Sequence, residues 1–169
     1  MSEGTAKIPQ GEPAFRVRRA ELSDVDALVK LVNEAFRVER FFIDGDRTDA
    51  EHIVQRFQSG RFLVAEDASA RMAASVYVEL RGEHGYFGLL AVDPARQRAG
   101  LGRLLVAAAE EVCRDAGCHT MDLQIVNLRT ELPPYYRRLG YAESGQMPFA
   151  AEATPKVPCH FVRMSKPLR

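Results

Sequence analysis

The stretch "LLAVDPARQRAGLGRLLV", residues 89–106, joins an apolar, strand-like run to the start of a helix, with Gly100 and Gly102 at the junction. The first turn of a helix leaves about four backbone N–H groups without partners, and the helix dipole makes that end partly positive. Glycine has no Cβ atom, so an anion can approach these amides closely. The stretch therefore predicts a phosphate-binding turn, the alternative being a strand-to-helix turn that merely contains two glycines.

The glycine spacing narrows the class of phosphate ligand. The Rossmann fingerprint G-x-G-x-x-G is absent, because no glycine follows Gly102 at the required distance. The P-loop pattern G-x-x-x-x-G-K-[ST] is absent as well. Arg96, Arg98 and Arg103 add positive charge that would steer phosphates to the turn. The pattern thus favours a phosphate ligand and disfavours dinucleotides and nucleoside triphosphates.

Apolar periodicity along the rest of the chain predicts an α/β (α+β) fold. Short turns between the runs from residue 61 to residue 92 favour antiparallel hairpins, whereas the strand–helix–strand unit at 86–126 favours a right-handed parallel crossover. We expect a mixed, mostly antiparallel sheet of about seven strands, flanked by about four helices, the first capped by Ser23. The expected strands are 14–20, 61–67, 71–80, 86–92, 119–126, 141–147 and 159–168, and the expected helices are 21–36, 49–60, 101–116 and 133–140.

Composition predicts one domain at residues 13–169 behind a flexible polar lead-in at 1–12. The 169 residues are 46% hydrophobic and carry 23 basic and 23 acidic side chains, so the net charge is zero. This balance argues against nucleic acid or a membrane surface as partner. No apolar run is long enough for a membrane span, and the N-terminus lacks the apolar core of a signal peptide. Three scattered cysteines form no disulfide framework, so we expect a cytoplasmic protein.

The quoted stretch resembles the central motif of the GNAT acetyltransferase superfamily. That motif is an apolar strand and V-x-P, followed by Q/R-x-x-G-x-G/A at the start of a helix, and Gln97, Gly100 and Gly102 occupy its three signature positions. Downstream, Tyr136 and Gly140 match the superfamily pattern Y-x-x-x-G-[FY]. The order of elements agrees as well, and two motifs in register make the resemblance specific.

The resemblance implies that the phosphate ligand is the pyrophosphate of acetyl-CoA, held by the backbone amides of the glycine motif. The pantetheine arm would run along the strand at 86–92 like an added strand. A bulge in that strand would splay the central parallel pair at the CoA site, and a backbone N–H near its residue 90 would stabilise an oxyanion. The implied CoA-binding residues are Leu90, Val92, Gln97, Arg98, Ala99, Gly100, Leu101, Gly102, Arg103 and, more loosely, Asn127.

The resemblance also implies catalytic roles. Tyr136, a phenol with an ordinary pKa of about 10, would protonate the departing CoA thiolate as general acid. A base is useful because the attacking amine must be neutral. Superfamily members often carry Glu or His on the strand before the glycine motif, but Tyr86 and Gly88 stand there in this chain. Glu79 and His84 are the nearest alternatives and are the predicted bases, each having a solvated edge or turn as its alternative role.

The segment between the first two helices is where such folds build the acceptor pocket. No group of His, Cys or carboxylate side chains has metal-ligand spacing, so no metal is expected. The residues that could line the pocket are Phe41, Phe42 and Arg47, together with Phe149 and His160 from the C-terminal hairpin, although each has a structural alternative.

The expected function is transfer of an acetyl group from acetyl-CoA to a primary amine by direct attack in a ternary complex. The resemblance leaves open whether the amine belongs to a small molecule or a protein, whether longer acyl donors are used, and whether the chain forms a homodimer. A non-catalytic acyl-CoA-binding regulatory module is the alternative, because the strand base is missing. Tyr136 argues against that alternative.

Overall fold

A computed structural model describes residues 14–169 of the chain. The predicted lead-in at 1–12 lies outside the described residues, so the domain boundary stays a prediction. The α-helices are α1 (Val25–Ala35), α2 (Ala50–Ser59), α3 (Leu101–Asp115) and α4 (Leu132–Arg138). The strands are β1 (Arg16–Arg19), β2 (Ile43–Asp44), β3 (Arg61–Glu66), β4 (Met72–Arg81), β5 (His84–Val92), β6 (Thr120–Val126), β7 (Ala142–Pro148), β8 (Thr154–Pro155) and β9 (His160–Pro167).

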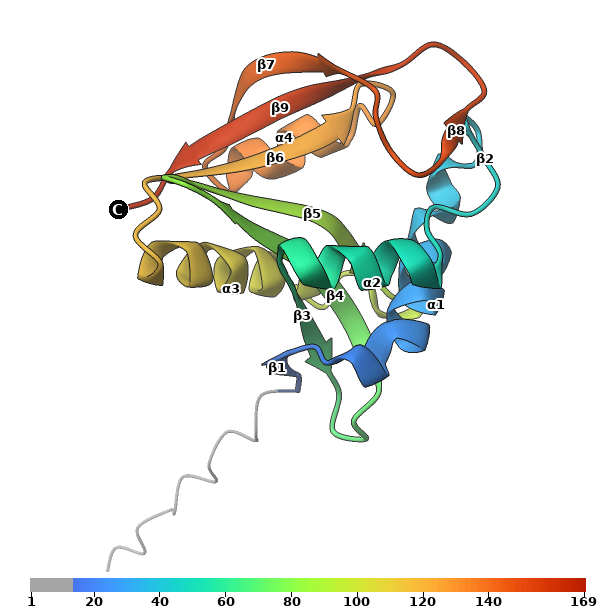
Figure 1. Ribbon diagram of the computed structural model, residues 1–169, viewed down its shortest axis with the longest axis vertical. Coiled ribbons are helices and arrows are strands. Elements are labelled where there is room, and N and C mark those ends of the chain that lie inside the picture. Colours follow the sequence, from blue (N-terminus) through green and yellow to red (C-terminus); the bar gives the residue numbers. More distant parts are fainter. Residues whose placement is uncertain (1–13) are drawn as a thin grey trace, which may run out of the picture.

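Seven of these strands form one sheet in the order β1-β3-β4-β5-β6-β9-β7 (Figure 1). β5 and β6 are parallel, and every other neighbouring pair in this sheet is antiparallel. α3 connects the two parallel strands, which is the crossover that the sequence predicts. The predicted fold class, a mostly antiparallel sheet with a central parallel pair and four α-helices, is confirmed.

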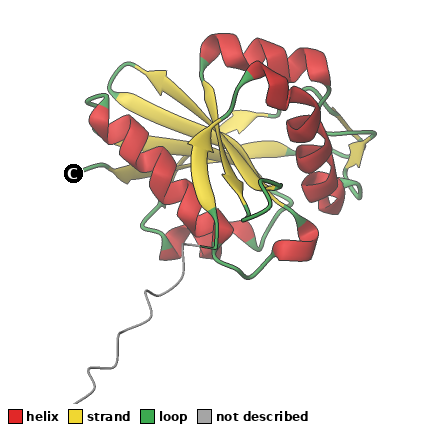
Figure 2. Ribbon diagram, turned by 90° about the horizontal axis from the view of Figure 1, so that it is seen from below, coloured by secondary structure: helices red, strands yellow, loops and turns green. Residues whose placement is uncertain are grey.

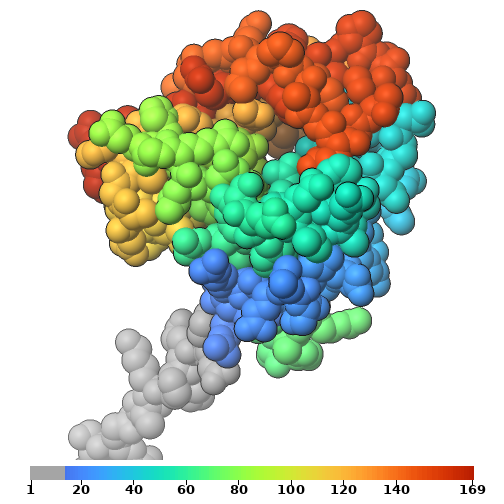
Figure 3. All heavy atoms as spheres, viewed as in Figure 1, coloured from blue at the N-terminus to red at the C-terminus, as the bar shows by residue number. Residues whose placement is uncertain are grey.

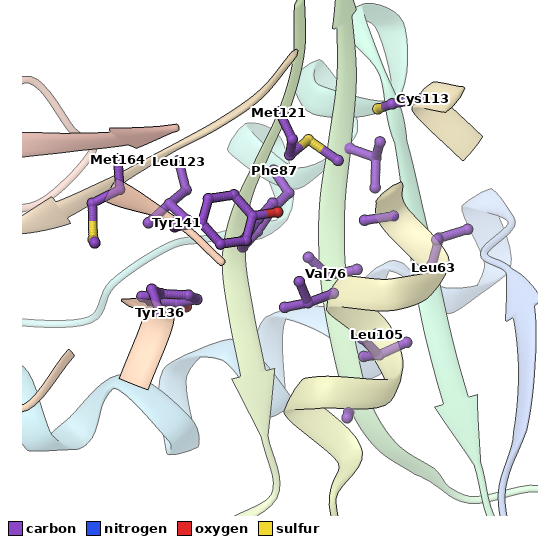
Figure 4. Packing of buried hydrophobic residues seen from close by; sticks show 14 of the residues in the cluster. Leu63, Val76, Phe87, Leu105, Cys113, Met121, Leu123, Tyr136, Tyr141 and Met164 are labelled. Atoms are coloured by element: carbon purple, nitrogen blue, oxygen red, sulfur yellow. The ribbon is translucent and has the colours of Figure 1, made fainter. Parts of the chain in front are cut away.

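Helices cover both faces of the sheet (Figure 2). On one face, α1 and α2 bury an apolar cluster that includes Leu28, Ile53 and Phe62. On the other face, α3 packs on the central strands through Leu105 and Cys113, and α4 adds Tyr136 to the same cluster. Figure 4 shows part of this cluster. The sheet is therefore buried on both sides at its centre, where β4 alternates its side chains between the two clusters.

β5 contains one extra residue beside β4. Tyr77 pairs with Gly88, whereas Ser75, two residues away on β4, pairs with Ala91, three residues away on β5. Leu89 lies within this bulge, and its φ of +49° is in the left-handed region that residues with side chains rarely adopt. The strand therefore bends at Leu89.

The bend coincides with the separation of the parallel pair. β5 and β6 are paired only near their starts, from His84↔Thr120 to Tyr86↔Asp122. Beyond that point β6 continues beside β9 alone, and β5 continues beside β4. Figure 1 shows the two strands diverging from their common end. The predicted splay is present, and it opens a gap at the centre of the sheet.

A buried hydrogen-bond network fastens α3 to the far half of the sheet. Tyr141 donates its hydroxyl proton to one carboxylate oxygen of Glu110 on α3, at 2.8 Å. Lys166 on β9 donates to the other oxygen, also at 2.8 Å. The tyrosine that ends the second sequence motif thus ties the start of β7 to α3, and Lys166 ties β9 to the same carboxylate.

Two local features differ from the sequence prediction. Ser23 is not the N-cap of α1, because residues 22–24 first form a 3-10 turn and Asp24 then takes the cap position. The carboxylate of Asp24 accepts from the N–H of Glu21 at 2.8 Å, which stabilises that turn. The sequence also gave no sign of the small antiparallel pair β2–β8, since two-residue strands carry no periodicity.

Gly85 is the point of closest approach between β5 and α3. A Cβ atom there would lie 2.4 Å from the Sγ and 2.8 Å from the Cβ of Cys113. We expect Gly85→Ala to lower the free energy of unfolding by about 1–3 kcal/mol through overpacking, measured by urea denaturation. Gly145→Ala, whose Cβ would meet only the flexible end of Arg163, is the matched control and should change little.

The same contact predicts coupling between the two positions. Gly85→Ala combined with Cys113→Ala should cost less than the sum of the single substitutions, because removing Sγ relieves the closest overlap. Additive losses would contradict this account of the packing.

Candidate active site

A cavity of about 650 Å³ lies where β5 and β6 diverge. It is bounded by the bulged half of β5, the start of α3, the far half of β6, and α4. The segment between α1 and α2 closes another side, together with part of the β7–β8 loop. The cavity therefore has one wall made of main chain at α3 and another made of charged and aromatic side chains.

The start of α3 presents an uncapped helix end to this cavity. Gly100 is the N-cap residue with φ +77°, and no side chain in the described part of the chain caps the helix. Arg98 is also left-handed, with φ +71°. Of the predicted CoA-binding residues in the glycine motif, all but Ala99 line the cavity: Gln97, Arg98, Gly100, Leu101, Gly102 and Arg103. Arg96 instead pairs with Asp67 in the β3–β4 turn.

The bulged strand supplies the floor beside this helix end. Leu90 and Val92 line the cavity as predicted, and so do Gly88 and Tyr86. A Cβ atom on Gly88 would lie 2.6 Å from the hydroxyl of Tyr86, so the phenol covers the strand next to the bulge. Burial raises the pKa of Tyr86 above its ordinary value, although nearby arginines oppose the shift. Tyr86 is therefore a protonated phenol at neutral pH.

Tyr136 lines the cavity from α4. Its side chain is 5% exposed and packs against Phe87 and Tyr141, with ring centroids 6.0 and 6.1 Å away (Figure 4). Burial raises the pKa of Tyr136 well above its ordinary value. The aromatic packing fixes the ring, and the raised pKa keeps the hydroxyl proton available for donation.

The two predicted bases do not line the cavity. Glu79 accepts hydrogen bonds from Tyr77 at 2.7 Å and from Arg81 at 2.9 Å. Burial would raise its pKa, but these partners outweigh burial and the pKa is lowered. His84 is exposed at the opposite end of β5 from the bulge, with Nδ1 2.8 Å from Asp122. Their roles as bases stay predictions.

Asn127 borders a separate, smaller cavity. Its side-chain oxygen accepts from the N–H of His160 at 2.9 Å, and its own N–H bonds to the carbonyl of His160. The side chain thereby holds the end of β6 to the start of β9. Its predicted contact with CoA stays a prediction.

Only one of the predicted acceptor-pocket residues lines the main cavity, namely Arg47. Phe42 is fully buried in a cluster beneath the β2–β8 pair, whereas Phe41 is 62% exposed. Phe149 packs on Phe161 with ring centroids 5.1 Å apart, and His160 takes part in the β6–β9 contact described above.

Sequence reasoning missed four charged residues in this region: Glu39, Arg56, Arg129 and Glu152. Glu39, on the 3-10 turn Phe36–Glu39, lines the cavity and accepts from Arg129 at 2.8 Å. Burial raises the pKa of Glu39 despite the opposing charge of Arg129. These residues come from four separate segments, so no spacing along the chain could have revealed them.

Glu152, in the β7–β8 loop, binds two arginines. Arg47 and Arg56 each donate to one of its oxygens at 2.9 Å. Burial would raise the pKa of Glu152, but the two guanidinium groups outweigh it and the pKa is lowered. In the space-filling view the C-terminal segment, orange to red, lies against the segment around α2, in teal (Figure 3). These ion pairs hold that contact together.

The family model for the acetyltransferase (GNAT) family matches residues 25–141. This range contains both sequence motifs, the bulged strand and the cavity-lining helix end. The chain belongs to the GNAT acetyltransferase family. Its residues 14–169 include no helix long and apolar enough to cross a membrane, and they hold no group of three or more His, Cys, Asp or Glu side chains arranged for a metal ion.

Two curated proteins resemble part of this GNAT chain. Mycothiol acetyltransferase of Clavibacter sepedonicus is 30% identical over 88 residues, covering 52% of the chain and 29% of that protein. A protein of Oryza sativa subsp. japonica named "Probable glucosamine 6-phosphate N-acetyltransferase 2" is 33% identical over 93 residues, covering 49% of the chain and 54% of that protein. The chain thus matches less than two thirds of the length of either relative.

Solved structures show the same fold. A solved structure described as "yncA, a putative ACETYLTRANSFERASE from Salmonella typhimurium with its cofactor Acetyl-CoA" superposes with a TM-score of 0.72. It is 20% identical to this GNAT chain, covering 93% of the chain and 95% of that structure.

The pair Glu39–Arg129 gives a pH-dependent stability prediction. Arg129→Met would leave a buried carboxylate without its partner, at a cost of about 3 kcal/mol at pH 8. Because the folded-state pKa of Glu39 is raised, its ionisation opposes folding, so stability is lost as the pH rises and regained as it falls. The deficit of Arg129→Met should therefore be smaller at pH 5 than at pH 8 in urea unfolding.

Glu39→Gln with Arg129→Met is the control for this experiment. In the absence of the carboxylate, the difference between this double variant and Glu39→Gln should be smaller than the Arg129→Met deficit at pH 8 and nearly independent of pH. A deficit of Arg129→Met that stays constant between pH 5 and pH 8 would rule out Glu39 as its cause.

Proposed function

We propose that the chain is an N-acetyltransferase that moves an acetyl group from acetyl-CoA to a primary amine by direct attack in a ternary complex. One observation carries the proposal: the uncapped start of α3, the bulge of β5 and the side chain of Tyr136 all line a single cavity. These are the parts needed to hold a thioester, polarise it and protonate its leaving group.

The start of α3 would bind the pyrophosphate of acetyl-CoA. No side chain within residues 14–169 caps the start of α3, so the backbone amides of its first turn are available to a ligand where the dipole favours an anion. Arg98 and Arg103 line the same part of the cavity and supply fixed positive charge. Arg96, paired with Asp67, is proposed to shape the turn rather than to bind phosphate.

The free edge of β5 would bind the pantetheine arm. From Phe87 onward β5 pairs with β4 on one side and has no strand partner on its β6 side within residues 14–169. Backbone groups near Leu90 and Val92 can therefore pair with the amides of an extended ligand, as in strand addition. An N–H near Leu90 would also stabilise the oxyanion that forms on the acetyl carbonyl.

Transfer then needs two proton movements. The neutral amine attacks the thioester carbonyl, a C–N bond forms, and the C–S bond breaks as the tetrahedral intermediate collapses. Tyr136 would give its proton to the departing CoA thiolate. The amine loses one proton, which Glu79 or His84 would accept only through water, because neither lines the cavity. Glu39 lines it, and its raised pKa makes it a stronger base than an ordinary carboxylate.

The non-catalytic alternative rests on Tyr86, a protonated phenol where many family members carry a base. A module of that kind would bind acyl-CoA without turnover. Release of free thiol in a panel of small-molecule and peptide amines separates the two functions, because sustained release with any amine excludes the module.

Gly102 tests the proposed CoA site. Its added Cβ would project into the cavity, 2.8 Å from the hydroxyl of Tyr135 and 3.8 Å from Leu90. Because the motif Q/R-x-x-G-x-G/A accepts alanine at this position, Gly102→Ala is the control and should keep the Kd for CoA within about twofold. We expect Gly102→Val to weaken CoA binding about tenfold in calorimetry, because its branched side chain keeps the pyrophosphate from the amides. The same loss should separate Gly102→Val/Tyr135→Phe from Tyr135→Phe. If the double variant instead binds as tightly as Tyr135→Phe, the effect is crowding by Tyr135 and not exclusion of phosphate.

Tyr136 tests the proposed general acid. Tyr136→Phe keeps the ring that packs on Phe87 and Tyr141 and removes only the hydroxyl. We expect kcat to fall about a hundredfold while the Kd for CoA stays within about twofold. Stopped assays of thiol release and calorimetry measure the two quantities. An unchanged kcat would exclude Tyr136 from the acid role.

A further inference from the structure

Two arginines at the acceptor side of the cavity share one carboxylate. Arg47 and Arg56 both line the cavity, whereas Glu152, which binds both, does not. The side chains of Arg47 and Arg56 are only 13% and 24% exposed. Two largely buried positive charges therefore face the cavity with a single negative charge bound to them.

The two guanidinium groups are held in place on their other sides. Arg47 stacks over the ring of Phe36 at 5.4 Å, and Arg56 stacks over Tyr77 at 5.0 Å. The Nε of Arg56 is buried and has no hydrogen-bond partner in the described part of the chain. Because this Nε is enclosed by the protein, a ligand in the cavity would meet the terminal nitrogens instead, and Glu152 binds one of them on each arginine.

A third arginine on this side of the cavity does not supply such a site. Arg129 bonds to two carboxylates, those of Glu39 and Glu131, so its charge is fully met from within the chain. Arg47 and Arg56, in contrast, share one hydrogen-bonded carboxylate between them. Planar guanidinium groups bind carboxylate and phosphate oxygens through paired hydrogen bonds, which makes an anionic group their natural ligand.

We propose that the acceptor amine carries an anionic group, a carboxylate or a phosphate, which Arg47 and Arg56 bind while Glu152 holds both arginines in position. This inference rests on the proposed function. Both arginines line the same cavity as Tyr86, and Tyr86 covers Gly88 beside the bulge. An anion bound there places an amine of the same molecule toward the thioester, so the acceptor is a small amino acid or a phosphorylated amino compound.

Calorimetry on protein saturated with unacetylated CoA tests the inference, because nothing turns over in that complex. The probes are matched pairs: L-alanine against L-alaninamide for the carboxylate, and glucosamine 6-phosphate against glucosamine for the phosphate. In at least one pair the anionic member should bind about tenfold more tightly or better. The pair that shows the preference identifies the anionic group. Equal or weaker binding of both anionic members overturns the inference.

Variants then assign the preference to the two arginines. Arg47→Gln and Arg56→Gln should each lower the anionic-to-neutral affinity ratio about tenfold or more. Arg37→Gln, an exposed arginine on the neighbouring turn, is the matched control and should keep the ratio. Glu152→Gln keeps an acceptor oxygen for only one of the two arginines, so, as a positioning residue, it should lower the ratio less than either arginine variant. An unchanged ratio in both Arg47→Gln and Arg56→Gln would overturn the proposal.

The measurement separates this inference from the proposed function. Anion preference without thiol release from any amine would support the anion site and defeat the transferase. Thiol release from neutral amines, with no anion preference in binding, would support the transferase and defeat the anion site.

Discussion

One extra residue in β5 is the constraint on which the rest of the site depends. With Leu89 in a left-handed conformation, the strand bends, and its pairing with β6 ends at Tyr86. The bend costs backbone strain of order 1–3 kcal/mol. It is maintained because β5 is pinned on both sides of Leu89, to β4 by the ladder and to α3 at Gly85. Without the bulge, β6 would continue along β5 and fill the cavity with a continuous sheet.

The position of α3 follows from the same constraint. The turn at residues 93–100 connects the bulged end of β5 to α3, and the uncapped start of the helix lines the cavity beside the bulge. Its other end is held by Cys113 against Gly85 and by Glu110, which binds both Tyr141 and Lys166. These contacts tie the halves of the sheet that β5 and β6 would otherwise let separate. The proposed donor site is thus a gap in a sheet, kept open by a strained residue and kept from widening by the contacts of Glu110 with Tyr141 and Lys166.

The sequence predicted most of the fold, and it located the segments of β5 and α3 that line the cavity. Alternation and helical spacing located the seven main strands and four helices, and the glycine motif located the turn at Gly100 and Gly102. These signals are local, so a single pass along the chain finds them. The predicted bases show the limit of local signals. Glu79 and His84 are close to the apolar part of β5 in the sequence, but they do not line the cavity. Glu39 lines it from the 3-10 turn that follows α1. Which carboxylate faces a cavity is decided by tertiary packing.

Of the proposed acceptor half, the sequence predicted Arg47 and missed its partners for a related reason. Arg47 precedes α2 and Arg56 lies within it, yet their shared partner Glu152 is about a hundred residues away, in a loop with no periodic pattern. The proposed donor half would use backbone groups, which many different side chains can surround. The proposed acceptor half would use side chains from separate segments, each of which can change without disturbing the sheet. A fold built in this way can keep one acyl donor while its loops change the charge that the acceptor must carry.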